Sequence, residues 1–354
     1  MEIEIKGKKI GEGYPCYITF EAGPTHDGLE SAQQLVRLAA EAGADAIKFQ
    51  ILDPDRLVAD KKQLFQFDIL VDKDSGETKT IERPLYDLLK ERSMSAEEWK
   101  QVKQTADELG IAFFATVGFE DEVALLQEIG CDSIKIASAD VNHVPLLRLA
   151  ARSGMVIQLD TGNASLGEIE QAVDIIQAEG NERIIIHQCP SGYPARLESI
   201  QLSMIKTLKT MFPYPAAFSD HTPGWDMDIA AVVMGADLVE KTITMDRSTP
   251  SVEHIMSLEP GEMTRFISAI RDVETAMGNG RRFMTPEQKE KRNSIRRSLF
   301  LRSPAKAGTP LTKCDIEFRR PGFGIPPDKV DELDGLSLVR DVDAGEMLHW
   351  SDLV

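Results

Sequence analysis

The sequence lacks the features that define several large classes of protein. No apolar run is long enough to cross a bilayer, and residues 1–9 do not form the apolar core of a signal peptide. The four cysteines are far apart and form no Cys-x-x-Cys pair: Cys16, Cys131, Cys189 and Cys314. This spacing argues against disulfides and against a structural zinc site. We therefore expect a cytoplasmic protein without a membrane partner.

The chain is also short of positive charge. It has 40 lysines and arginines against 58 aspartates and glutamates, which gives a net charge of −18. Nucleic acid and anionic lipid repel such a chain, so neither is an expected partner. If the substrate is an anion, the site must gather cations locally. Lys48, Lys135 and Lys241, each inside or at the end of a predicted strand, could do so.

What the sequence does contain is a regular alternation of predicted strands and helices. Eight short apolar runs each end in a charged or hydroxyl residue, at 17–23, 45–50, 112–116, 133–138, 155–162, 184–191, 216–222 and 238–246. Helical spacing of apolar residues recurs between them and after the last, at about 29–43, 96–109, 120–130, 143–153, 165–179, 197–211, 225–235 and 260–277. The alternation predicts a parallel α/β protein, either an open doubly wound sheet or a closed (β/α)8 TIM barrel. The nearly even repeats favour the barrel.

In such a barrel the carboxyl ends of the strands meet at one site. The polar residues at the predicted strand ends would then line a single bowl: Glu21, Lys48, Gln50, Lys135, Ser138, Asp160, Ser219, His221 and Glu240. Neighbouring residues of a strand face opposite sides, so Glu240 and Lys241 cannot both enter the barrel.

Two segments interrupt the repeats. Residues 51–92 are too long for an ordinary connection and are predicted to form a wall or lid over the bowl. After Gly278 the repeats stop and short strands with turns follow. We predict a barrel domain at 1–280, a linker at 281–297 and a small β module at 298–354, near the lower size limit for independent stability.

Two predicted strands carry a lysine among apolar residues, Lys48 in AIKFQ and Lys135 in SIKIAS. A lysine that points into a barrel is costly unless an anion faces it. The anion is either a carboxylate of the chain, in a structural ion pair, or a bound phosphate or carboxylate ligand. Ser138 and Ser219 lie at other strand ends and favour ligand binding, because charge-assisted hydrogen bonds are strongest in a water-poor cavity.

His221 follows a strand end in the segment SDHT and is a candidate metal ligand or acid/base group. His26 and His254, in loops of the same predicted face, could join it. The spacing HxxxH is absent, so the spacing of the histidines does not by itself establish a metal site.

Several motifs occur together in one order: EAGxxHxG (21–28), AGADAIKFQ (42–50), KIAS (135–138), PSGYP (190–194), SDHT (219–222), SLEP (257–260) and RRPGFGI (319–325). In these motifs the chain resembles the sialic acid synthase family, which includes N-acetylneuraminate, legionaminic and pseudaminic acid synthases and spore coat polysaccharide biosynthesis protein E. The resemblance covers almost the whole chain. It implies that the small β module is an antifreeze-like (SAF) domain.

The resemblance implies an enzyme for surface polysaccharide biosynthesis. Such an enzyme condenses phosphoenolpyruvate with an aldehyde-form hexosamine or related aldose, releasing phosphate and forming a 3-deoxy-2-keto sugar acid. The implied phosphoenolpyruvate ligands are Lys48, Thr116, Lys135, Ser138 and Ser219. The implied sugar ligands are Gln50, Tyr193, Glu253 and Arg320, with Arg320 supplied by the partner in a domain-swapped homodimer. Glu21, Lys48, Lys135 and His221 are the implied catalytic residues, and His221 would bind Mn2+ or Mg2+.

The chain departs from the family pattern near the metal and the phosphate. Thr242 stands where a second metal-binding histidine is usual, and Asp160 stands where a serine is usual. Thr25 replaces an asparagine and Gln188 replaces a histidine. If a metal binds through His221, the replacement ligand would be Glu240, His254 or Asp160. The alternative is a diverged paralogue that binds phosphoenolpyruvate or a sugar without catalysis. A third possibility, another barrel aldolase or phosphosugar synthase, is disfavoured by the C-terminal module.

Overall fold

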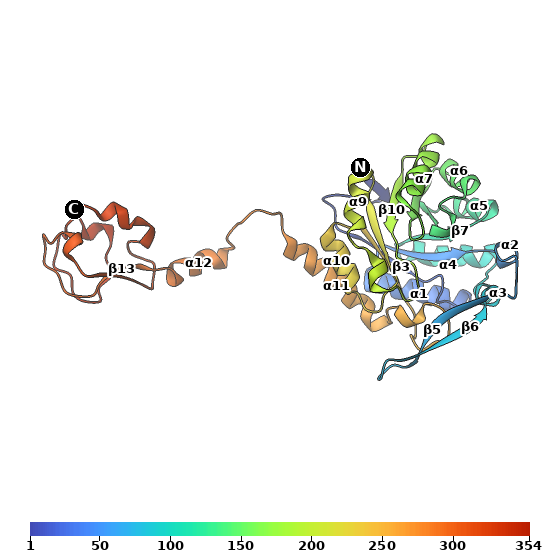
Figure 1. Cartoon of the computed structure of the whole chain (residues 1–354), viewed down its shortest axis with the longest axis horizontal. Coiled ribbons are helices and arrows are strands. Elements are labelled where there is room, and N and C mark those ends of the chain that lie inside the picture. Colours follow the sequence, from blue (N-terminus) through green and yellow to red (C-terminus); the bar gives the residue numbers. More distant parts are fainter. The chain divides into compact units, whose positions relative to one another are not determined.

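A computed structural model describes the whole chain, residues 1–354. Eight parallel strands close into a barrel, which confirms the predicted TIM-barrel fold (Figure 1). The barrel strands in chain order are β3 (Tyr17–Glu21), β4 (Ala46–Ile51), β7 (Ala112–Val117), β8 (Ser133–Ile136), β9 (Val156–Asp160), β10 (Ile184–Gln188), β11 (Ala216–Asp220) and β12 (Leu238–Thr242). The first and last of these strands pair with each other, so all eight carboxyl ends surround one axis.

Helices surround the barrel on the outside (Figure 1). They are α1 (Leu29–Ala42), α4 (Ala96–Glu108), α5 (Glu120–Glu128), α6 (Val144–Arg152), α7 (Leu166–Ala178), α9 (Met204–Met211), α10 (Asp226–Met234) and α11 (Pro260–Met277). α4 and α7 begin at serine capping boxes, formed by Ser95 with Glu98 and by Ser165 with Glu168. The single helix expected at 197–211 is divided. α8 (Leu197–Ile200) ends at Gln201, whose left-handed φ of 46° is incompatible with a continuous helix.

Successive side chains of each strand point alternately into the barrel and toward the surrounding helices. Tyr17, Phe114 and Leu238 belong to a buried cluster inside the barrel, together with isoleucines of a short hairpin formed by β1 (Ile3–Ile5) and β2 (Lys8–Ile10). Counting onward by twos from these interior residues leads to the polar strand ends. Apolar side chains therefore fill the amino-terminal half of the barrel interior. The polar side chains lie at the carboxyl ends of the strands.

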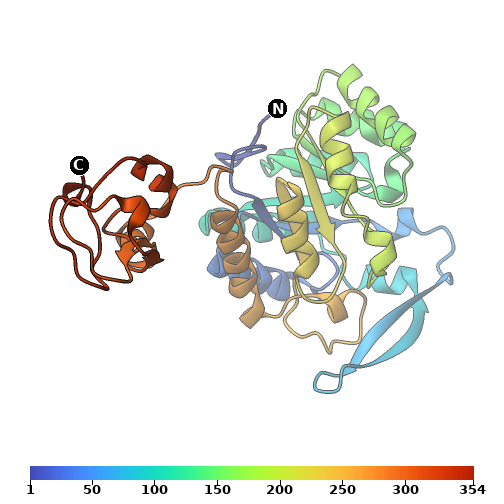
Figure 2. The same cartoon turned by 60° about the vertical axis from the view of Figure 1, so that its left-hand side comes forward.

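The insertion after β4 forms a small structure of its own. It contains α2 (Pro54–Leu57), an antiparallel hairpin of β5 (Leu64–Asp72) and β6 (Glu77–Pro84), and α3 (Leu85–Lys90). The hairpin projects from the barrel (Figure 2). At its turn, Lys73 pairs with Asp246 at 2.7 Å and with Glu259 at 2.5 Å, in the segment that follows β12. These ion pairs attach the turn of the hairpin to the segment that follows the last barrel strand.

The chain divides into two compact units, Met1–Gly278 and Asn279–Val354. In the second unit, β13 (Ser298–Leu301) pairs with β14 (Ile316–Arg319) over a small apolar core. The segment predicted as a linker contains a helix, α12 (Pro286–Ile295). The second unit also holds three short 3-10 helices, η3 (Leu311–Lys313), η4 (Pro327–Leu333) and η5 (Trp350–Asp352). No helix of the chain has the length and apolarity needed to span a bilayer.

Candidate active site

The barrel interior holds a chain of alternating positive and negative side chains at the strand ends. Lys48 of β4 lies 2.5 Å from Glu21 of β3 and 2.6 Å from Glu240 of β12. These three strands are neighbours in the barrel, and Glu21 is directly in register with Lys48. All three side chains are nearly inaccessible to water, with exposed fractions of 4–6%. Their interactions are therefore poorly screened.

Glu240 connects this pair to a second lysine. Its other carboxylate oxygen lies 2.8 Å from Lys135, which is fully buried. Lys135 also contacts Asp160 at 2.9 Å and Ser219 at 3.1 Å. Burial alone would lower the pKa of Lys135, but Asp160 and Glu240 outweigh it and the pKa is raised. Burial likewise opposes the ionised form of Glu240, yet Lys135 and Lys48 hold its pKa well below the usual range.

Both lysines are therefore ion-paired, which the sequence left as the alternative to ligand binding. Two lysines face three carboxylates: Glu21, Glu240 and Asp160. An anionic ligand that reaches Lys135 must compete with Asp160, one of the residues that depart from the family pattern. Lys241, the third candidate cation, lies outside the barrel. There it donates to Asp220 and to the Thr222 carbonyl, so it supplies no charge to the bowl.

His221 extends from the loop after β11 with one ring nitrogen fixed. Its Nδ1 lies 3.0 Å from the Pro190 carbonyl, to which it donates, so Nε2 carries the free lone pair. The Tyr193 ring lies against it, with ring centroids 4.6 Å apart. Burial lowers the pKa of His221, although Asp160 and Asp220 oppose this effect, so the neutral form is favoured. A neutral imidazole held by a backbone carbonyl is typical of a metal ligand or of a proton acceptor.

The other donors expected for a metal do not assemble around His221. No three His, Cys, Asp or Glu side chains converge in a metal-binding group anywhere in the chain. Both oxygens of Glu240 contact lysines, and His254 binds Thr244 at 2.7 Å. Thr242 contacts Glu253 at 3.5 Å. The structure thus offers one well-oriented ligand and no completed site, and a metal centre remains a prediction.

The remaining predicted ligands lie on different elements and differ in their exposure to solvent. Gln50 donates to Glu21 at 3.4 Å, and Thr116 of β7 is in register with Lys135. Ser138 begins a 3-10 turn, η1 (Ser138–Asp140), directly after β8. Arg320 belongs to the second compact unit and is exposed.

His26 and His254 line a separate cavity of about 200 Å³ that does not include His221.

Glu253 is a buried carboxyl with an unusual titration. Burial raises its pKa from 4.5 to about 7, although Lys48 and Arg92 oppose this shift. Its backbone has a left-handed φ of 69°, within the 3-10 turn region before η2 (His254–Met256). A carboxyl that titrates near neutral pH can give or accept a proton under working conditions.

The raised pKa of Glu253 predicts a pH-dependent stability. The folded protein binds this proton more tightly than the unfolded chain, so stability should fall as pH rises from about 4.5 to about 7 and then level off. In Glu253→Gln this contribution is absent. At 1.36 kcal/mol per pKa unit, we expect the variant to gain roughly 3 kcal/mol relative to the parent between pH 4.5 and pH 8. Urea unfolding at these two pH values measures this difference. If the unfolding free energies of the variant and the parent differ by the same amount at both pH values, Glu253 titrates normally.

Sequence reasoning missed one central residue, His187 of β10. The motif comparison noted Gln188 as a replacement for the usual histidine of the family. Gln188, however, faces outward and donates to the Ile200 carbonyl at 2.9 Å. His187 lies one residue earlier and is fully buried inside the barrel, where its Nδ1 lies 3.1 Å from Lys135. The alternation of side chains along the strand could have identified His187. Ile185 faces the barrel interior, and His187, two residues further on, lies on the same face.

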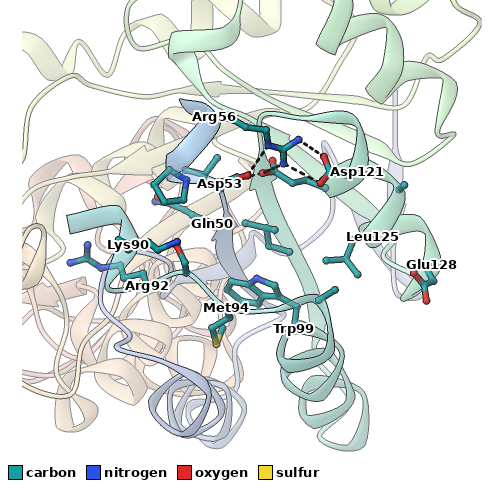
Figure 3. A pocket seen from close by; sticks show the side chains of 17 residues that line it. Gln50, Asp53, Arg56, Lys90, Arg92, Met94, Trp99, Asp121, Leu125 and Glu128 are labelled. Atoms are coloured by element: carbon teal, nitrogen blue, oxygen red, sulfur yellow. Dashed lines mark hydrogen bonds and ion pairs between the residues drawn. The ribbon is translucent and has the colours of Figure 1, made fainter. Parts of the chain in front are cut away.

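A larger cavity, of about 480 Å³, lies beside the bowl rather than in it. Figure 3 shows it between the insertion and the helices α4 and α5, with Trp99 on one side. Arg56 pairs there with Asp53 at 2.8 Å and with Asp121 at 2.7 Å, so its charge is already compensated. Of the predicted site residues only Gln50 lines this cavity. Gln50 lies near the end of β4, so this cavity borders the strand ends.

The structure thus combines a closed (β/α)8 barrel, two buried lysines at its strand ends and a small C-terminal β unit. Residues 35–282 match the NeuB family and residues 296–354 match the SAF domain. The chain belongs to the NeuB family. It is accordingly an enzyme of the sialic acid synthase class, a phosphoenolpyruvate-condensing transferase, as the motifs predicted.

Relatives of known name support this assignment over nearly the full length. The chain is 33% identical to the N,N'-diacetyllegionaminic acid synthase of Legionella pneumophila, over 98% of this chain and 97% of that protein. It is 33% identical to the spore coat polysaccharide biosynthesis protein SpsE of Bacillus subtilis, over 99% and 97%. The solved N-acetylneuraminic acid synthetase of Leptospira borgpetersenii, in complex with citrate, superposes with a TM-score of 0.71. It has 31% identity and covers 83% of this chain and 97% of that one.

Proposed function

We propose that this enzyme condenses phosphoenolpyruvate with the aldehyde form of an N-acylated hexosamine or related aldose. The product is a nonulosonic acid of the sialic acid type, used for surface polysaccharide. The observation that carries the proposal is the buried array in which Glu240 joins Lys48 to Lys135, with Ser219 beside it. Similarity to the named synthases supports the choice of substrates.

In the proposed reaction, C3 of phosphoenolpyruvate attacks the aldehyde carbon and water adds to C2. The C2–O bond then breaks and phosphate leaves. Lys48, Thr116, Lys135, Ser138 and Ser219 would hold phosphoenolpyruvate, whose charge matches the ammonium and hydroxyl donors. Burial strengthens these contacts because water does not screen them.

The sugar would bind above this array. Glu21, held by Lys48 and Gln50, would face the reacting aldehyde, and Tyr193 and Glu253 would line the same side. Glu253 has the pKa expected of a group that exchanges a proton with the sugar oxygen near pH 7. Arg320 would come from the second subunit of a domain-swapped homodimer. We propose that this dimer works in the cytoplasm.

His221 is the proposed ligand of a divalent ion, Mn2+ or Mg2+, which would act as a Lewis acid toward the aldehyde. We expect Mn2+ to raise the melting temperature of the parent, because a ligand that binds only the folded state stabilises it. His221→Ala should lose this shift and most of the turnover. His349→Ala, in the second compact unit, is the matched control and should behave like the parent. A His221→Ala variant with unchanged Mn2+ response and turnover would contradict the role of His221 as a ligand.

Phosphate release from phosphoenolpyruvate tests the function directly. The assay should use a panel of N-acylated hexosamines and simple aldoses, with and without Mn2+. We expect release that depends on one acceptor class. Two observations favour a second candidate, a binding protein without catalysis. Thr242 stands where a histidine is usual, and no group of metal-binding side chains converges. Phosphoenolpyruvate binding without release for any acceptor would establish that alternative.

A further inference from the structure

The barrel contains an imidazole that the proposed reaction does not use directly. His187 is completely inaccessible to solvent, and both ring nitrogens have partners within hydrogen-bond distance. Nδ1 lies 3.1 Å from Lys135 Nζ and 2.9 Å from Ser219 Oγ. Nε2 lies 3.0 Å from Gln158 Oε1. His187 therefore lies beside two of the proposed phosphoenolpyruvate ligands, on the inner side of the barrel.

The partners fix which nitrogen carries the proton. An ammonium group can only donate, so Nδ1 must accept from Lys135 and the proton must be on Nε2. The Nε2–H then donates to the Gln158 oxygen. The orientation of this amide is consistent, because its own nitrogen donates to Ser133 Oγ at 3.0 Å. Burial and the charge of Lys135 lower the pKa of His187 well below its ordinary value, so a second proton is excluded near neutral pH.

We infer that His187 is a positioning residue, a neutral acceptor of fixed tautomer that holds the Lys135 ammonium, beside the Ser219 hydroxyl, for the phosphate of phosphoenolpyruvate. This inference rests on the proposed function. The chemistry explains why an imidazole serves better than a carboxylate here. Lys135 already faces the carboxylates of Glu240 and Asp160. A further carboxylate would repel the incoming phosphate, whereas a neutral nitrogen orients the ammonium without adding negative charge.

The tautomer can be observed without any substrate. We expect nitrogen-15 spectra of the histidine-labelled full-length protein to show the Nε2-protonated form for His187, unchanged between pH 5.5 and pH 8. The signal is assigned by its loss in His187→Asn. A proton on Nδ1, or titration near pH 6.5, would overturn the inference. In Gln158→Leu the Nε2 proton loses its acceptor while the contact with Lys135 remains. We expect the Nε2-protonated form to persist in this variant, because Lys135 still requires Nδ1 as an acceptor.

Steady-state kinetics test the positioning role. His187→Leu removes the acceptor, and we expect its KM for phosphoenolpyruvate to rise about 10- to 100-fold, the range for losing a hydrogen bond to a charged donor. The KM for the sugar should stay unchanged. His187→Asn places an amide oxygen near the position of Nδ1 and should restore most of the affinity. A merely structural residue would instead lower the melting temperature and the active fraction while leaving both KM values as they were.

The outcomes separate the two proposals. If the parent releases no phosphate with any acceptor, the proposed function fails, and the positioning role fails with it. If the parent is active and His187→Leu folds but keeps the parental KM for phosphoenolpyruvate, only the positioning role fails. If His187→Leu does not fold, His187→Asn and Gln158→Leu decide. A proton on Nδ1 of His187 in folded Gln158→Leu would overturn the inference.

Discussion

Replacing Lys135 with methionine should abolish phosphate release, with a fall of about 1,000-fold or more, because the variant loses a desolvated cation at the developing charge. Lys135 is fully buried and contacts Glu240 at 2.8 Å and Asp160 at 2.9 Å. The variant leaves these two carboxylates without this partner. Removing one member of a buried ion pair typically costs about 3–5 kcal/mol of stability. Denaturant unfolding should show this loss, and the kinetics should be measured at a temperature where the variant remains folded.

Lys209→Met provides the matched control. Lys209 pairs with Asp237 at 2.9 Å, and this aspartate precedes β12 at the end of the barrel opposite the bowl. We expect a smaller loss of stability, because the Lys209 side chain is 28% exposed, and unchanged kcat and KM. If Lys135→Met retained parental turnover, Lys135 would not be a ligand or a catalytic residue, and the proposed site would be wrong.

Replacing Asp160 with serine should strengthen phosphoenolpyruvate binding. Asp160 contacts Lys135 at 2.9 Å and accepts from Ser219 at 3.2 Å, so it engages two of the groups proposed to hold the phosphate. Two like charges about 4 Å apart interact by roughly 4 kcal/mol at an effective dielectric constant of 20. Part of this repulsion is offset by the ion pair that the variant loses. We therefore expect the KM for phosphoenolpyruvate to fall about 10- to 100-fold, measured by initial rates.

Asp160→Asn and Asp160→Glu complete this test. The asparagine removes the charge at nearly constant volume and should also lower the KM, whereas the glutamate keeps the charge and should not. The inhibition constant of inorganic phosphate should change in parallel, because phosphate would use the same donors. A KM that rises in Asp160→Ser would show that the carboxylate supports binding, by holding Lys135 and Ser219 in place, more than it opposes the substrate.

The strand ends show which features of the structure can be predicted from local sequence patterns. The alternation of short apolar runs and amphipathic segments predicted the barrel and placed Lys48, Lys135, Ser219 and Glu240 at its strand ends. These predictions depend on spacing along one strand or one helix, which the sequence displays directly. The same parity implied that Glu240 and Lys241 face opposite sides, and the structure confirms it. Glu240 joins the two lysines inside, and Lys241 binds Asp220 outside.

The sequence by itself therefore determined the fold class, the family and the set of polar strand ends. Only the tertiary structure decided which of these groups meet. Glu240 is 192 residues from Lys48 and 105 residues from Lys135, and closure of the barrel brings all three together. The partners of His187 likewise come from β8, β9 and β11. No local pattern encodes such contacts, because they depend on the register between strands that are neighbours in the barrel but distant in the chain.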